Sequence, residues 1–395
     1  FNPDVNSQYT NANFTVPSGD INIFTKDFKY PQVFRGNLAL DTELPGGITA
    51  TLEGIYTKTL NNVLYTNVNS DPAVKFNWTG GPDNRTVFNR TSLDPTYGAI
   101  YVGSNTNEGY TYNLTASLAK RFDFGLNATL AYSYGDAQAV SEGTSSQNSS
   151  QWRGQVSIDG RNSPVLGRSD FALGHRVISS LSYRKAWTRD QNVATTITLF
   201  YDGMAGSPYS YIIAGSGARN LNNETGSTSR NRSLIWIPAD ASEINLVDYT
   251  SNGVTVTAAE QWENLNAFIE DDPYLSNNRG GYAEKNSNYM PWANFLDLSL
   301  RQDFGMNLGG KNHKFQISWD VFNFANLLNS SWGTRYSVIG DFNNFFLYQF
   351  DGYEADGTTP KFSYRLGDKK GTDAMNIQDF SSRWQMRLGL RYIFN

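Results

Sequence analysis

The chain has 395 residues, of which 39% are hydrophobic and 17% are charged, and its formal net charge is -5. This charge excludes the strongly basic balance expected of a protein that binds nucleic acid. The sequence has no run of about 18 apolar residues, so it predicts no membrane-spanning helix. Aromatic residues are abundant, with 24 Phe, 23 Tyr and 9 Trp. A transmembrane β-barrel fits this composition because every second residue of its strands can be polar.

The first predicted element is a β-hairpin. Apolar and polar residues alternate over 34–41 and again over 48–56. Alternate side chains of a strand point to opposite faces, so each run gives one apolar and one polar face. Leu44-Pro45-Gly46-Gly47 joins the runs and has the residue types of a tight turn.

Three further hairpins and a final strand follow along the chain. The hairpins show the same alternation in both strands: 110–118 with 124–134, 175–187 with 193–203, and 294–304 with 313–323. In the final strand, Trp384, Met386, Leu388, Leu390, Tyr392 and Phe394 share one face, and Gln385, Arg387, Gly389 and Arg391 share the other. The arginine face fits a wet lumen and the apolar face fits lipid. We therefore predict about nine spans, each near or above the roughly 9 to 11 residues that a tilted strand needs to cross a bilayer.

The connectors between these strands alternate strictly between short and long. Short turns lie at 45–47, 121–124, 187–192 and 305–312. Long polar segments occupy about 1–30, 67–109, 138–174, 205–289 and 325–382. In outer-membrane barrels the short turns face the periplasm and the long loops face the outside. This order predicts extracellular loops for the long segments.

The strand count predicts a partial barrel. Counted back from a periplasmic C-terminus, nine strands begin outside the cell, whereas a complete single-chain bacterial barrel has an even number. We expect residues 1–395 to be the C-terminal portion of one larger barrel, with the plug and the N-terminal strands outside this chain. If the sequence is wrongly divided into strands here, the chain could instead have ten spans and form a small barrel that is complete by itself.

Several segments resemble TonB-dependent outer-membrane receptors of the Bacteroidetes Oar-like type, which are related to SusC. The resemblance is carried by residues 268–284, 294–304, 315–329, Trp332-Gly333 and 383–395. It implies a barrel of about 22 strands around a plug. It also implies location in the bacterial outer membrane and energised uptake of a peptide or glycan nutrient. The implied partners are outer-membrane lipid, the plug and N-terminal barrel segment, the TonB-ExbB-ExbD inner-membrane complex and a surface lipoprotein.

Charged side chains on the polar faces of the strands are predicted to line the lumen. They are Asp41, Glu53, Arg176, Arg184, Asp297, Arg301, Asp320, Arg387 and Arg391. A wide barrel has an aqueous or plugged interior, unlike a small barrel that is filled by its own side chains. These charges either hold water or pair with a folded plug, and the simplest interpretation is that they are polar only because the lumen is wet.

Aromatic residues of the loops are the predicted ligand contacts, because their rings can stack on a sugar or a peptide. They are Trp152, Tyr209, Tyr211, Trp236, Trp262, Tyr274 and Trp292. The alternative is that they form the interfacial aromatic girdle or pack the loops together.

The sequence predicts no enzyme and no firm metal site. Two acidic clusters, 351–357 and 270–272, have the oxygen ligands that calcium takes but not the spacing of a known calcium loop. His175 and His313 are the only histidines, and Asp170 with His175 is the nearest pair to a catalytic one. Two other functions stay open: a structural or protein-export barrel in an envelope complex, and a passive outer-membrane channel.

Overall fold

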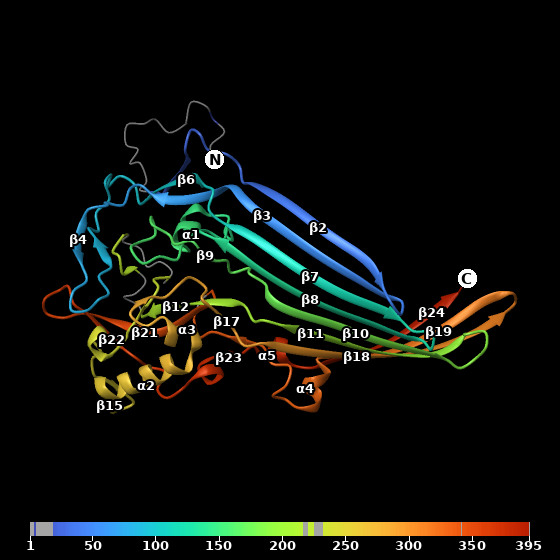
Figure 1. Cartoon of the computed structure of the whole chain (residues 1–395). Coiled ribbons are helices and arrows are strands. Elements are labelled where there is room, and N and C mark those ends of the chain that lie inside the picture. The colour runs from blue at the N-terminus through green and yellow to red at the C-terminus, as the bar shows by residue number, and fades with distance from the viewer. Residues whose placement is uncertain (1–3, 5–18, 216–219, 225–231, 341, 395) are drawn as a thin grey trace.

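Nine long antiparallel strands form the body of the protein in a computed structural model that describes residues 4, 19–215, 220–224, 232–340 and 342–394 (Figure 1). They are β2 (Gln32–Leu44), β3 (Ile48–Asn67), β7 (Tyr110–Arg121), β8 (Leu126–Ala139), β10 (Gly174–Ala186), β11 (Val193–Met204), β18 (Ala293–Leu308), β19 (Lys311–Phe322) and β24 (Gln385–Phe394). Each pairs with the next along the chain. The predicted hairpins and final strand are confirmed.

One predicted turn is too long. The turn expected at 305–312 is only Gly309 and Gly310, because Leu308 pairs directly with Lys311. Both glycines have positive φ, 59° and 79°, as a two-residue hairpin turn of the favoured hand requires. The strands therefore continue almost to the turn, and the exposed side chains of Met306 and Leu308 extend the apolar face.

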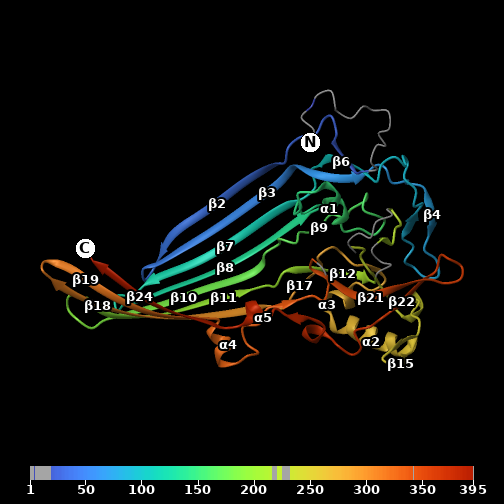
Figure 2. The same cartoon turned by 180° about the vertical axis from the view of Figure 1, so that it is seen from behind.

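The sheet is curved and open (Figures 1 and 2). Within the described residues β2 pairs only with β3, and β24 pairs only with β19. Each of these two strands therefore has one free hydrogen-bonding edge in the structure.

Shorter strands and helices gather at the end of the sheet opposite the short turns. The strands are β1 (Ile21–Phe24), β4 (Val74–Asn77), β5 (Thr86–Phe88), β6 (Ile100–Thr106), β9 (Gly167–Arg168), β12 (Pro208–Ala214), β13 (Trp236–Ile237), β14 (Tyr249–Ser251), β15 (Val254–Val256), β16 (Gly281–Tyr282), β17 (Asn288–Tyr289), β20 (Tyr336–Ser337), β21 (Asn344–Tyr353), β22 (Pro360–Ser363) and β23 (Asn376–Ile377). The helices are α1 (Asn148–Arg153), α2 (Ala258–Asp271), α3 (Pro273–Asn277), α4 (Phe324–Leu328) and α5 (Asp379–Ser382), with 3-10 turns η4 (Ala241–Glu243) and η5 (Gly371–Ala374). None of the helices in the described residues is long and apolar enough to cross a membrane.

The long connectors fold together rather than lying as separate loops. We call the described parts of 67–109, 138–173, 205–292 and 335–377 the loop domain. It has a four-stranded sheet in the order β17-β12-β21-β22 and a hydrophobic core in which Ile213, Leu265 and Phe345 have no solvent exposure. Of the predicted loop 1–30, residues 1–3 and 5–18 lie outside the described residues, and β1 pairs in parallel with β6.

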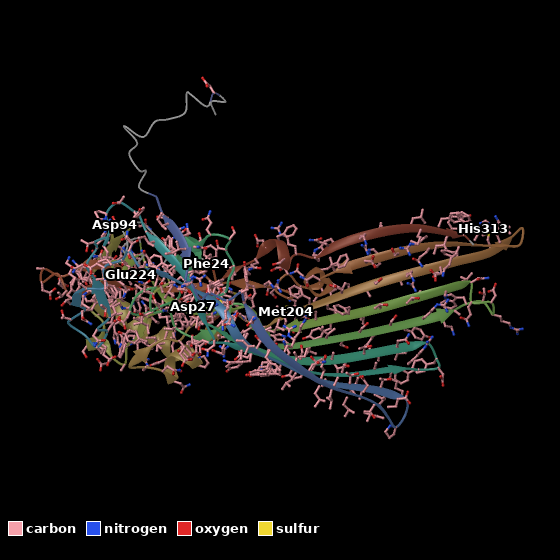
Figure 3. The ribbon with its side chains drawn as sticks, turned by 90° about the horizontal axis from the view of Figure 1, so that it is seen from above. Phe24, Asp27, Asp94, Met204, Glu224 and His313 are labelled. Atoms are coloured by element: carbon pink, nitrogen blue, oxygen red, sulfur yellow. The ribbon has the colours of Figure 1, made fainter. Side chains whose placement is uncertain are left out.

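Figure 3 shows the two ends of the molecule. Asp94 and Glu224 lie in the loop domain, and His313 lies at the far end of the strands. The loop domain and the turn between β18 and β19 therefore lie at opposite ends of the strands.

The apolar face of the strands can be tested by placing a charge on it. Leu388, near the middle of β24, is 74% exposed in the structure. We expect Leu388→Arg to destabilise the protein in liposomes by about 2 to 4 kcal/mol, because this substitution puts a cation in hydrocarbon. Arg391→Gln, on the other face of the same strand, is the matched control. Equal urea midpoints for the two variants would contradict a lipid environment at Leu388.

Candidate functional site

All nine predicted lumen residues lie on one face of the sheet. Residues that pair across strands share a face, and the pairs Asp41–Thr51, Glu53–Thr115, Arg301–Thr196 and Asp320–Arg387 run along this polar face. Arg176, Arg184, Asp297 and Arg391 belong to the same register set.

Several of the charges on this polar face are paired across neighbouring strands. The Arg176 guanidinium lies 2.8 Å from the Asp202 carboxylate, and the Arg387 guanidinium lies 2.8 Å from that of Asp320. Ser299 donates a hydrogen bond of 2.6 Å to Asp320 as well. The face therefore holds a network of charge-assisted hydrogen bonds, which suits a polar environment and excludes direct contact with lipid tails.

Asp303 connects polar side chains of two neighbouring strands, β18 and β19. Its carboxylate lies 2.9 Å from Lys314 Nζ and 3.9 Å from Arg301 Nε, and it accepts a 2.8 Å hydrogen bond from Gln316 Nε2. Asp303 is buried although it stands on a face that is otherwise half-exposed. Sequence reasoning placed it on this face but did not single it out.

Rings gather at both ends of the apolar face. Toward the loop domain, stacked or tilted rings run from Tyr56 through Tyr110, Tyr112 and Tyr134 to His175. Near the short turns, His313, Phe315, Tyr392 and Phe394 form a second group. Amphipathic rings prefer the two membrane–water interfaces, so these groups have the positions of the two girdles of a barrel.

Buried ion pairs tie the connectors of the loop domain to one another. Arg161 lies 3.2 Å from Glu224, and Lys285 Nζ lies 2.8 Å from Glu142, each pair joining two different connectors. Breaking such a pair is costly because it leaves one charge buried without its partner. These contacts fix the relative positions of the connectors around the pocket described next.

A pocket of about 560 Å³ lies between the end of β8 and the loop domain. Its walls include the apolar side chains of Ile158, Val165 and Leu166 and the rings of Tyr274 and Tyr282. Arg168, Glu284 and Lys285 supply charge. The size and the mixture of apolar walls with a few polar groups are typical of a small-ligand site.

The polar groups of this pocket are held in place by the loop domain. Tyr282 donates a 2.9 Å hydrogen bond to Asp83, and the Tyr274 hydroxyl accepts one of 2.7 Å from the Glu284 backbone. The Arg168 guanidinium lies 3.2 Å from Asp136, and Lys285 is paired with Glu142. The Glu284 side chain is exposed. A ligand would therefore meet a rigid aromatic wall and an accessible carboxylate.

The chain matches a known protein family. The profile of the outer membrane beta barrel domain matches residues 1–336. The chain belongs to the outer membrane beta barrel domain family. This membership, together with the two-faced sheet, locates the protein in the outer membrane. A search of curated proteins and a search of solved structures each gave no match.

The predicted ligand aromatics of this barrel domain are mostly not accessible. Trp152 has no exposure, and Tyr209 and Tyr211 are 3% and 1% exposed. The expectation that these three are open to a ligand is wrong for this structure, because the loops bury an apolar core of their own and these rings fill it. These three rings instead pack the loops together, which was the alternative to ligand binding.

The other predicted aromatics have mixed positions. Trp236 packs edge-to-face on Tyr282 at 5.0 Å, and Trp262 is partly buried against the core. Tyr274 lines the pocket, and Trp292 is 39% exposed at the outer end of β18. A ligand role for Tyr274 and Trp292 stays a prediction. Arg168, Glu284 and Lys285 were not predicted. Glu284 ends the segment 268–284 that carries the family resemblance and Lys285 follows it, whereas no sequence signal marked Arg168.

The candidate metal and catalytic residues have other partners. In the described residues no group of three or more His, Cys, Asp or Glu side chains is arranged to hold a metal ion. Asp272 caps α3 and accepts a hydrogen bond from Tyr211, and Asp351 pairs with Arg365 at 3.4 Å. Asp170 accepts a 2.7 Å hydrogen bond from Asn286, whereas His175 bonds to the Tyr132 hydroxyl at 2.6 Å.

The tyrosines of the loop-domain core give a test at high pH. Burial raises the pKa of Tyr209 from 10.0 to about 12, and burial also raises the pKa of Tyr211 well above its usual value. As the pH rises, these tyrosines lose their protons at a lower pH in the unfolded chain than in the folded protein. The free energy of folding that comes from the buried, protonated Tyr209 is therefore fully present below pH 10 and disappears as the pH approaches 12. For Tyr209 this difference is worth roughly 3 kcal/mol. We expect a late phase in the ultraviolet titration of phenolate that Tyr209→Phe reduces by one tyrosine. Complete ionisation near pH 10 in the folded protein would contradict this core.

Proposed function

We propose that this protein is a TonB-dependent outer-membrane transporter of the Oar-like type. In this proposal, strands outside the described residues complete the barrel, a plug fills it, and the inner-membrane TonB-ExbB-ExbD complex pulls the plug during uptake. The observation that carries the proposal is the open, nine-stranded sheet with an ion-paired polar face. The family membership supports the outer-membrane setting.

The free edges of β2 and β24 favour a larger barrel. An open sheet edge does not occur within hydrocarbon, because no water is there to satisfy its N–H and C=O groups. In the structure these two strands do not pair with each other, although each is long enough to span a bilayer. Additional strands between the two edges would satisfy both.

The polar face favours a plugged interior over an empty one. Small barrels fill their interior with their own side chains, whereas barrels of about 22 strands enclose a plug. Here Arg387 is paired with Asp320, yet its side chain is still 69% exposed. Such exposed charges are available to hydrogen-bond the surface of a folded plug.

The pocket beside Tyr274 and Tyr282 favours a nutrient of the peptide or glycan class. Rings stack on sugars and on peptide side chains, and the exposed carboxylate of Glu284 can accept hydrogen bonds from hydroxyl or amine groups. Neither class needs a metal or a catalytic group at the site. A surface lipoprotein lid belongs to the same proposal by resemblance to SusC-related proteins.

Conductance and TonB binding test the transport mechanism. We expect the full-length protein, purified from its own outer membrane, to bind the periplasmic domain of TonB and to conduct little in planar bilayers. Urea at a concentration that unfolds a plug but leaves the barrel intact should raise the conductance. Steady conductance without urea, together with no binding to TonB, would indicate a passive channel instead.

Substitution of Glu284 tests the ligand site. We expect Glu284→Gln to weaken binding of the peptide or glycan that stabilises the full protein in a thermal-shift screen by about 5-fold to 100-fold, because a charged acceptor is lost. Glu263→Gln, an exposed acid of α2 outside the pocket, is the matched control. Unchanged affinity in Glu284→Gln, with ligand binding intact, would place the ligand site elsewhere.

A further inference from the structure

A group of exposed apolar side chains lies at the outer ends of β18, β19 and β24, where Trp292 is the last residue of the loop domain and the other five lie outside it. Helix α4 begins two residues after β19, and α5 ends three residues before β24. Both labelled views show α4 projecting from the sheet near β18 (Figures 1 and 2). The exposed fractions are 39% for Trp292, 39% for Leu327, 62% for Leu328, 55% for Trp332, 84% for Phe380 and 40% for Trp384. We call these six residues the lateral patch.

Hydrogen bonds hold the two halves of the lateral patch together. The Asn323 amide donates to the Gly333 and Ser382 carbonyls at 2.9 and 2.8 Å, and the Arg335 backbone donates to Ser382 Oγ at 2.9 Å. The Trp384 backbone donates to the Asn326 side chain. Asn323 is buried and has positive φ, so it sets the direction in which the chain leaves β19. The patch is thus a built surface rather than a set of unrelated loop residues.

The lateral patch continues the apolar face of the sheet. Trp384 precedes Met386, Leu388 and Leu390 with the two-residue spacing of one strand face. Trp292 lies four residues before Leu296, which is twice that spacing and so the same strand face, and both line an apolar pocket of about 350 Å³ with Ala325 and Trp332. Since the strand face below it contacts lipid in the outer membrane, the patch adjoins an established lipid interface.

We infer that the lateral patch lies in the outer leaflet of the membrane and anchors this side of the barrel at the boundary between headgroups and acyl chains. Tryptophan is enriched at that boundary, and short segments with exposed Leu and Phe insert their apolar sides there. In water, by contrast, so many exposed apolar side chains near one another would be a liability. Membrane lipid is therefore what contacts the lateral patch.

Site-directed spin labelling tests this inference, because the sequence has no cysteine. Leu328→Cys and Phe380→Cys would each carry a nitroxide in a cysteine-free full-length protein reconstituted in liposomes. Leu388→Cys marks the bilayer, and Val254→Cys, 65% exposed in the loop domain, marks water. We expect both patch labels to collide with oxygen more than with a water-soluble nickel chelate, at a depth shallower than the label at 388.

Labels at two positions of the lateral patch, 328 and 380, are measured so that the result does not depend on one site alone. Nickel-dominated collisions at both 328 and 380, as at 254, would overturn the inference and leave the patch to a protein partner. Heat-modifiability on a gel confirms that each labelled protein is folded before it is measured. The result does not depend on TonB or on any transported ligand, so it separates the anchor from the proposed transport.

Discussion

Backbone hydrogen bonding within hydrocarbon is the constraint on which the rest of this structure depends. A strand that crosses a bilayer finds no water, so its N–H and C=O groups must pair with neighbouring strands. The consecutive ladders from β2 to β24 meet this requirement at every internal strand. Once the ladder is fixed, side chains can only alternate between two faces, and the two faces take opposite chemistry.

The two faces then explain where charges and rings lie. Exposed Leu and aromatic side chains occupy the lipid face, with rings at both ends. Arg176, Asp303 and Asp320 occupy the other face, and each forms an ion pair with a residue of an adjacent strand. The loop domain is outside the hydrocarbon and follows the ordinary rule for water-soluble folds, with a buried core around Phe345 and Leu265.

The strands were predictable from sequence because their period is short and local. Alternation from Trp384 to Phe394 predicts the faces of β24 residue by residue, and the paired glycines at 309–310 mark a turn. The loop domain was not predictable in this way. Its core brings together Trp78, Tyr211 and Phe362, which lie far apart in the sequence and follow no common period. For the same reason the sequence predicted that the rings of Tyr211 and Trp152 are accessible to a ligand, although both are buried.

The central claim is that this sheet is one part of a wider barrel. A distance measurement between nitroxides at Leu38→Cys on β2 and Leu390→Cys on β24 tests it most directly, since both side chains are exposed on the apolar face. About eight strand intervals of roughly 4.8 Å separate the two edges along the sheet. A wider barrel predicts a separation on the order of 30 Å or more in the full-length protein in liposomes. A separation below about 15 Å would mean that β2 and β24 pair to close a small barrel, and would contradict the account.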